Sequence, residues 1–194
     1  VAAFDYKFKM KERPYKFTAE AYYKALGNII PYNVNNVKIT YYNGNQCSGY
    51  SAGIDIKLYG EFVQGTDSWV TFSLMSTKLK MKGMWVPMPT DQRYGVNLHF
   101  TDYFPGTERW KMTLKLAFAD GLPFGAPHKG LEYQHFRAPA YKLADVGMSY
   151  KAYDNEDKKK KSVFKNIWLG IDCLNLFGIS NVNSYYWVTD VTNQ

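Results

Sequence analysis

Residues 15–26, Tyr-Lys-Phe-Thr-Ala-Glu-Ala-Tyr-Tyr-Lys-Ala-Leu, alternate between apolar and polar side chains. The odd positions from Tyr15 to Ala25 are apolar, whereas Lys16, Thr18 and Glu20 occupy even positions. Successive side chains of a β-strand point to opposite faces of the sheet, so a period of two predicts a strand with one dry and one wet face.

The same alternation returns along most of the chain, most clearly in residues 110–118, where Leu114 and Leu116 flank Lys115. No stretch of helical length places apolar residues at three-and-four spacing. We therefore predict an all-β fold, an antiparallel up-and-down meander of about nine strands, each close to the roughly 9 to 11 residues of a tilted membrane strand. The predicted strand segments are 4–11, 15–26, 37–42 leading into 52–62, 68–77, 94–104, 110–118, 141–152, 167–173 and 185–188.

The connections between these strands alternate in length. Short ones at 12–14, 63–67 and 105–107 alternate with long ones, and a charged ten-residue junction, 153–162, falls on the short side. The long connections are 27–36, 78–93, 119–140 and 178–184. Short periplasmic turns and long extracellular loops are typical of transmembrane β-barrels, so we predict that the meander is part of a larger one, with its dry faces toward lipid. Aromatic residues beside the short connections predict an interfacial girdle; they are Tyr15, Phe62, Trp69, Tyr103, Phe104 and Trp110.

Composition excludes several classes of protein. The 194 residues carry 24 basic against 17 acidic side chains, a net charge of +7. A hydrophobic fraction of 46% is too high for a disordered chain. No window approaches the roughly 18 apolar residues of a membrane helix, and a mean hydropathy of −0.40 is compatible with alternating strands. Cys47 and Cys173 are too few for a disulfide framework and are expected to be unpaired thiols. The lysine run 158–161 lies beside acidic residues, which predicts a solvated turn and no nucleic-acid partner.

Chemical motifs are weak. Residues 49–53, Gly-Tyr-Ser-Ala-Gly, match the G-x-S-x-G elbow of serine hydrolases, but a strand pattern follows where that motif needs a helix. His99 lies on a polar strand face, and His128 and His135 lie seven positions apart in a loop, which is not the spacing of a metal site. We predict no enzyme activity, no metal and no cofactor.

Several stretches resemble one family. Residues 15–24, the Pro-Thr-Asp-Gln-Arg of 89–93, the Gly-Leu-Pro-Phe-Gly of 121–125, and 172–177 followed by 181–187 resemble the C-terminal barrel half of TonB-dependent outer-membrane receptors. The likeness spans nearly the whole chain, so residues 1–194 are expected to be a C-terminal barrel segment without the plug domain of that family. The edges of about nine strands would need further strands, because unpaired backbone groups in hydrocarbon cost several kcal/mol each.

The resemblance implies an active importer in the outer membrane of a Gram-negative bacterium. Such a receptor captures a scarce nutrient, such as an iron chelate, cobalamin or oligosaccharide, and uses energy from the TonB complex to admit it. Outer-membrane lipid, the nutrient and TonB are the implied partners, with a surface lipoprotein as a further one. Ligand contact is expected in the long loops, where the candidate residues are Trp85, His128, Tyr133, His135 and Arg137.

Two other functions remain open. One is a soluble barrel of eight to ten strands that encloses a small apolar ligand, with its dry faces inward. The other is an outer-membrane barrel hydrolase with Ser51 as nucleophile and a histidine as base.

Overall fold

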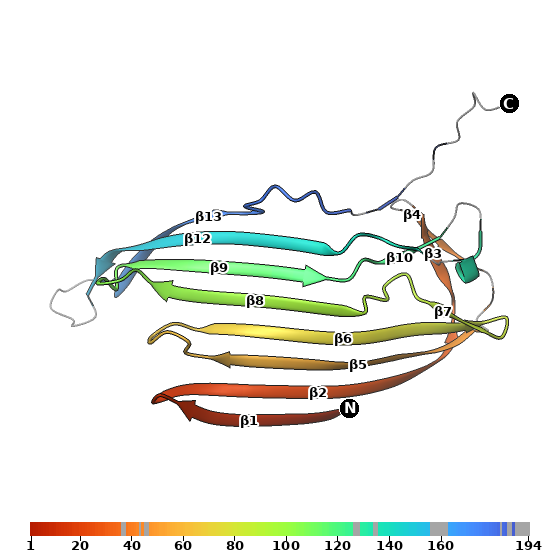
Figure 1. Cartoon of the computed structure of the whole chain (residues 1–194), viewed down its shortest axis with the longest axis horizontal. Coiled ribbons are helices and arrows are strands. Elements are labelled where there is room, and N and C mark those ends of the chain that lie inside the picture. Colours follow the sequence, from red (N-terminus) through yellow and green to blue (C-terminus); the bar gives the residue numbers. More distant parts are fainter. Residues whose placement is uncertain are drawn as a thin grey trace.

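The computed structural model describes residues 1–35, 38–42, 44, 47–125, 129–133, 136–155, 163–182, 184–185 and 188. Its main feature is one antiparallel sheet in which each strand pairs with the next along the chain, apart from side hairpins (Figure 1). The strand order is β1-β2-β5-β6-β8-β9-β12-β13, with β7 on the loop-side end of β6. The prediction of an all-β antiparallel meander is therefore confirmed. The bounds are β1 Ala2–Met10, β2 Arg13–Ile29, β5 Cys47–Gly60, β6 Ser68–Met81, β7 Met84–Pro87, β8 Tyr94–Tyr103, β9 Trp110–Ala119, β12 Tyr141–Asp154 and β13 Asn166–Cys173.

Several details differ from the sequence prediction. The segment expected at 37–42 forms β4 (Lys38–Tyr41), which pairs with β3 (Tyr32–Asn35) in a separate hairpin instead of extending β5. Strand β7 was not predicted; it folds back on β6 because Lys82 and Gly83, both with positive φ, form a two-residue turn. Of the segment expected at 185–188, the two ends are not in a strand, and residues 186–187 lie outside the described part.

The connections separate by length at the two ends of the sheet, which we call the turn end and the loop end. The connections 11–12, 61–67 and 104–109 lie at the turn end, on the left of Figure 1, where β12 also ends and β13 begins, and the longer connections leave the sheet at the loop end. The first turn consists of Lys11 and Glu12, with φ of 51° and 65°, so Arg13 and Pro14 already belong to β2. A second pair of short strands, β10 (Pro123–Phe124) and β11 (Phe136–Arg137), lies in the long 120–140 connection.

Strand register gives the sheet two chemically distinct faces. One row of register partners across seven strands is aliphatic or aromatic throughout: Tyr6, Phe17, Leu58, Val70, Leu98, Leu116 and Ala144. The row one residue further along is polar or carries a polar tip: Lys7, Lys16, Tyr59, Trp69, His99, Lys115 and Asp145. A shift of one residue turns every side chain to the other face, so the pairing keeps an apolar face and a polar face separate.

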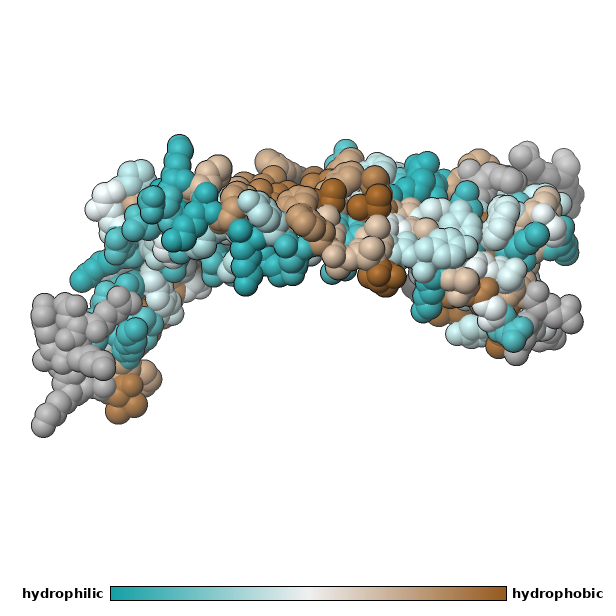
Figure 2. Space-filling view, turned by 90° about the horizontal axis from the view of Figure 1, so that it is seen from below, coloured by the Kyte–Doolittle hydropathy of each residue, from teal (hydrophilic) through white to brown (hydrophobic). Residues whose placement is uncertain are grey.

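The apolar face has no packed layer over it among the described residues. Phe4, Ile54 and Leu116 are 57%, 47% and 38% exposed, and apart from prolines the buried apolar side chains of the described chain are Tyr15, Leu79, Val86, Leu131 and Ala144. Figure 2 views the arched sheet edge-on, with hydrophobic residues gathered along the middle of its convex side and hydrophilic residues toward both ends. These exposed apolar side chains form one continuous surface, whereas those on an ordinary soluble protein are scattered singly.

Candidate functional site

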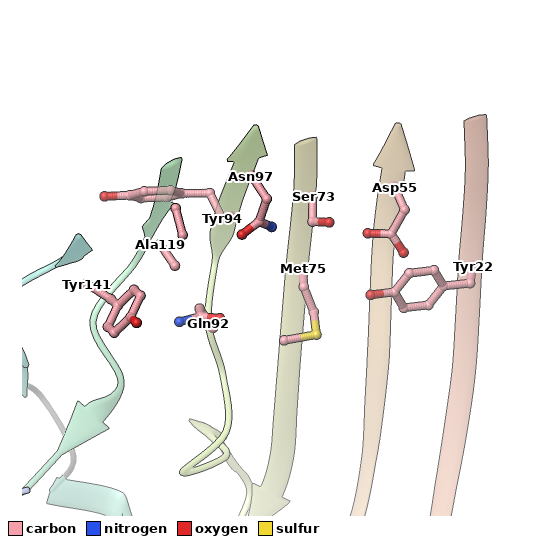
Figure 3. Close-up of a pocket in the computed structure, with 11 residues that line it drawn as sticks. Tyr22, Asp55, Ser73, Met75, Gln92, Tyr94, Asn97, Ala119 and Tyr141 are labelled. Carbon is pink, nitrogen blue, oxygen red and sulfur yellow. The ribbon is translucent and has the colours of Figure 1, made fainter. Parts of the chain in front are cut away.

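A hollow of about 420 Å³ lies on the polar face, toward the loop end (Figure 3). Its floor follows one row of register partners, in which small residues stand between larger polar ones: Asp55, Ser73, Gly95, Ala119 and Tyr141. A Cβ added at Gly95 would meet no atom within 4 Å, so open space lies directly above the strand there. The sequence thus forms the depression by placing its smallest side chains at the centre of the row.

Tyrosine rings lie at the two sides of this hollow. Tyr22 comes from β2 and Tyr141 from the start of β12, and both line it together with Gln92 and Asn97. The Tyr22 ring lies over Gly53 of the neighbouring strand, where any Cβ would overlap its phenol group. Gly53 is therefore required for the position of Tyr22, because only glycine allows the ring to cross the strand so closely.

Next to the hollow, at the loop end, an aspartate side chain takes the place of a missing strand as hydrogen-bond acceptor. Asp91, which is 2% exposed, accepts a hydrogen bond of 2.6 Å from the backbone N–H of Thr77 in β6. Pairing between β6 and β8 begins only at Tyr94, so the preceding segment uses a side-chain acceptor to satisfy the Thr77 amide. This explains the function of aspartate in the Pro-Thr-Asp-Gln-Arg stretch.

Arg137 joins three segments at the same place. Its guanidinium donates to the Asp91 carboxylate, to the Asp91 carbonyl at 2.7 Å, to Asp120 Oδ2 at 2.9 Å and to the Gly121 carbonyl at 3.1 Å. Arg93 adds a second cation, with Nε 2.6 Å from Asp120 Oδ2. We call Asp91, Arg93, Asp120 and Arg137 the loop-end ion cluster. It fixes the 88–93 and 120–138 segments to the ends of β6 and β9.

The two carboxylates of this cluster are buried and balanced by two arginines, of which Arg137 is 21% exposed and Arg93 57% exposed. Asp120 is 5% exposed. Burial alone would raise the pKa of its carboxyl, but the hydrogen bond from Arg93 and the charge of Arg137 outweigh burial and lower that pKa. The Asp120 carboxylate therefore stays ionised in the neutral range and holds both arginines.

A small apolar cluster completes the loop end. Leu79 and its register partner Val86 are buried, and the short 3-10 helix η1 (Leu131–Tyr133) contacts β7 and buries Leu131. Lys82 Nζ lies 2.9 Å from Glu132 Oε1, and this contact raises the pKa of Lys82 and lowers that of Glu132. The 120–140 connection is thus fastened to the sheet by packing as well as by charge.

The predicted ligand-contact residues occupy different places. Trp85 in β7 is 52% exposed and packs edge-on against Tyr50 at 5.2 Å, and Tyr133 in the adjacent η1 is 49% exposed with Lys129 5.7 Å from its ring. Arg137 is tied into the loop-end ion cluster. His128 and His135 lie outside the described residues. The hollow itself was not predicted, because Gly95 and Ala119 come to the same level only through the pairing of β8 with β9.

The turn end of the polar face carries a different chemistry. Lys57 lies 5.6 Å from the Trp69 ring, which stacks on His99 at 4.0 Å, and Lys111 lies 4.5 Å from the Trp168 ring. Trp69 and Tyr103, predicted as girdle residues, belong to this polar face by register, whereas Tyr15 and Trp110 lie on the apolar face.

The weak chemical motifs have structural positions. Ser51 is in the interior of β5, and its Oγ shares a hydrogen bond of 3.1 Å with Thr77 Oγ1, without a strand-to-helix elbow. Within the described ranges, no group of three or more His, Cys, Asp or Glu residues could hold a metal. Cys47 and Cys173 form no disulfide in the structure.

Comparison with known proteins gives no relative: no protein-family model, curated protein or solved structure matches the chain. The resemblance to TonB-dependent receptors therefore stays a prediction from the sequence. Among the described residues, no helix has the length and apolar character to cross a membrane.

Proposed function

We propose that this chain forms part of the wall of a transmembrane β-barrel in a bacterial outer membrane, with its apolar face in lipid and its polar face toward an aqueous lumen. The observation that carries the proposal is the uninterrupted apolar row across seven strands, together with the absence of a packed layer over it in the described chain. An apolar face that no other part of the protein covers is stable in contact with lipid tails, because they do not need to be displaced from it as water does.

Strand length supports this placement. Strands β8 and β9 have ten residues each. At about 3.4 Å per residue and a tilt of roughly 45°, such a strand spans about 24 Å, close to the apolar band of about 25 Å in outer-membrane barrels. The connections outside the strands then lie in water, short on one side and long on the other.

The edges of the sheet set a further requirement. Within the described residues, β1 pairs only with β2 and β13 only with β12. A strand edge in hydrocarbon leaves backbone groups without partners, at a cost of several kcal/mol each. In the proposed barrel, other strands therefore pair with both edges.

The transport role rests on the sequence resemblance. We propose that the complete barrel belongs to a receptor that imports a scarce nutrient with TonB-derived energy, with the long connections on the outside and a surface lipoprotein as a further partner. The hollow at the loop end lies on the polar face, where a captured ligand would meet it. The soluble-barrel alternative requires apolar side chains to point inward, whereas here they lie on the convex side (Figure 2).

Spin labels on adjacent residues test the orientation. After both native cysteines are replaced by serine, single cysteines are placed at Ile56 and Lys57 on β5 and at Leu114 and Lys115 on β9, and the protein is reconstituted in lipid vesicles. We expect labels at Ile56 and Leu114 to be accessible to oxygen, which concentrates in lipid, and labels at Lys57 and Lys115 to a water-soluble nickel chelate. The opposite pattern, or a chain that stays monodisperse in buffer without detergent, contradicts the proposal.

A further inference from the structure

The hollow on the polar face is chemically unlike the rest of that face, and we propose that it binds a neutral, hydroxyl-rich chain, that is, a linear oligosaccharide. This inference rests on the proposed transport function and names its ligand class. It is carried by the shape of the floor, by the two tyrosine rings beside it and by the charges around it.

The shape is an open trough across the strands. From β2, which carries Tyr22, to β12, which carries Tyr141, the sheet order has five strand-to-strand steps. With neighbouring strands about 4.8 Å apart, the trough is roughly 24 Å wide. Its volume of about 420 Å³ lies within the range of ligand sites. An extended ligand of several linked rings fits this form better than a compact one.

The rings and polar groups suit a sugar chain. A pyranose ring has an apolar C–H face, which stacks on an aromatic ring, and hydroxyl groups around its edge. Tyr22 and Tyr141 offer aromatic faces at the two sides, and Ser73 and Asn97 offer hydrogen-bonding groups between them (Figure 3). Within the described chain, the hydroxyls of Tyr22 and Tyr141 form no hydrogen bond, although Tyr22 lies close enough to Asp55 to feel its charge.

Charge selects against an anionic ligand. The Asp55 carboxylate lines the hollow and, within the described chain, forms no ion pair or hydrogen bond. Its register partner Glu20 places a second negative charge beside it, and like charges opposite each other repel. Lys57 on the same strand lies toward the turn end, over Tyr59 and Trp69, and Lys24 of β2 lies on the polar face beyond Tyr22, toward the loop end. A negatively charged metal chelate would meet two carboxylates here, whereas a neutral sugar can donate hydroxyl hydrogen bonds to them.

Gly95 offers a variant that blocks the hollow without removing any polar group. Its added side chain would enter open space on the polar face, so Gly95→Leu fills the trough while leaving the strand unstrained. Tyr22→Leu removes one stacking ring. Tyr23→Leu is the matched control, because Tyr23 is the adjacent residue of β2 and points to the apolar face.

The full chain in detergent micelles is titrated by calorimetry with maltotetraose, cellotetraose, xylotetraose and mannotetraose, and in parallel with ferric citrate and cobalamin. We expect at least one tetrasaccharide to bind, with affinity reduced tenfold or more by Gly95→Leu and by Tyr22→Leu and less than twofold by Tyr23→Leu. Circular dichroism verifies that each variant keeps its strand content.

Three results would overturn the inference: no binding of any of the four sugars, sugar binding that Gly95→Leu leaves unchanged, or binding of ferric citrate or cobalamin that Gly95→Leu abolishes. The spin-label experiment separates this failure from failure of the barrel proposal. If labels at Leu114 report lipid while the sugars do not bind, the membrane placement stands and only the ligand class is wrong.

Discussion

The strand region and the loop end of this protein are held together in different ways. In the strand region, most side chains of both faces remain partly exposed, and the hydrogen-bonded ladder joins the strands. At the loop end, Leu79, Leu131 and Asp91 are each at most 2% exposed. Arginine–aspartate pairs join three segments there. The loop end thus carries its own packing, whereas the sheet depends on whatever covers its faces.

This difference predicts two kinds of response to mutation. A mutation in the loop-end ion cluster should destabilise the protein equally in micelles and in vesicles, because the residues that it contacts belong to the chain itself. A change on the apolar face should matter only where lipid contacts that face. The following expectations run from the largest effect to the smallest.

Arg137→Met should give the largest loss. It leaves the buried carboxylates of Asp91 and Asp120 without their shared cation, and removing one partner of a buried pair costs about 3–5 kcal/mol. Hydrogen exchange of the Thr77 amide, which is bonded to Asp91, measures the local opening. Arg109→Met is the control, since Arg109 is exposed at the turn end. Equal protection in both variants, in micelles or in vesicles, would contradict a fastening role for Arg137.

Leu116→Lys tests the apolar face. A lysine facing lipid near the midplane costs about 2–4 kcal/mol of unfolding free energy, whereas Thr113→Lys on the polar face of the same strand should cost less than about 1 kcal/mol. Denaturant titration in vesicles gives both values. Because Leu116 is already 38% exposed in the described chain, a face that stays in water would tolerate the lysine, and equal stability of the two variants would exclude lipid contact at this position.

The sequence predicted the strand region much better than the loop end. Alternation along 15–26 and 110–118 is a local signal, and the structure keeps those strands with their apolar partners in register. Contacts between distant segments leave no such local pattern. Asp91, Asp120 and Arg137 meet only after three connections fold together, and nothing in the spacing of these residues indicates that they share one cluster.

Even the short strands show this limit. Residues 84–87 lie within the connection predicted at 78–93, and they pair with β6 because of a two-residue turn at Lys82 and Gly83. The hollow was missed for a related reason, since its floor is one register row and the register follows only from pairing. Arg137 was selected as a loop residue for ligand contact, and the structure gives its guanidinium four acceptors within the protein.

Gly121→Ala should have an intermediate effect at the loop end. Any Cβ at position 121 would overlap the backbone carbonyl of Ala138, so the two segments must separate, and overpacking of this kind costs about 1–3 kcal/mol. Exchange of the Ala138 amide, which donates to the Leu122 carbonyl, reports the separation. Gly27→Ala in β2 is the control, because a Cβ there meets nothing within 4 Å. An unchanged Ala138 exchange rate in Gly121→Ala would show that the close approach is not maintained in solution.

Acidification should weaken the loop end by the smallest step. The pKa values of Asp120 and Glu132 lie below their ordinary values, so both carboxylates stabilise the folded state above about pH 4, the value in an unfolded chain, and this contribution is lost as the pH falls through the lowered pKa. Carbon-13 NMR titration of the carboxyl carbons measures both midpoints directly. Arg93→Met should raise the titration midpoint of Asp120 and leave that of Glu132 unchanged. Lys82→Met should raise the midpoint of Glu132 and leave that of Asp120 unchanged, because each cation acts on its own partner. If each variant moved both midpoints, the two ion pairs would form one coupled unit, and the loop end would open in a single step below pH 4 instead of in two.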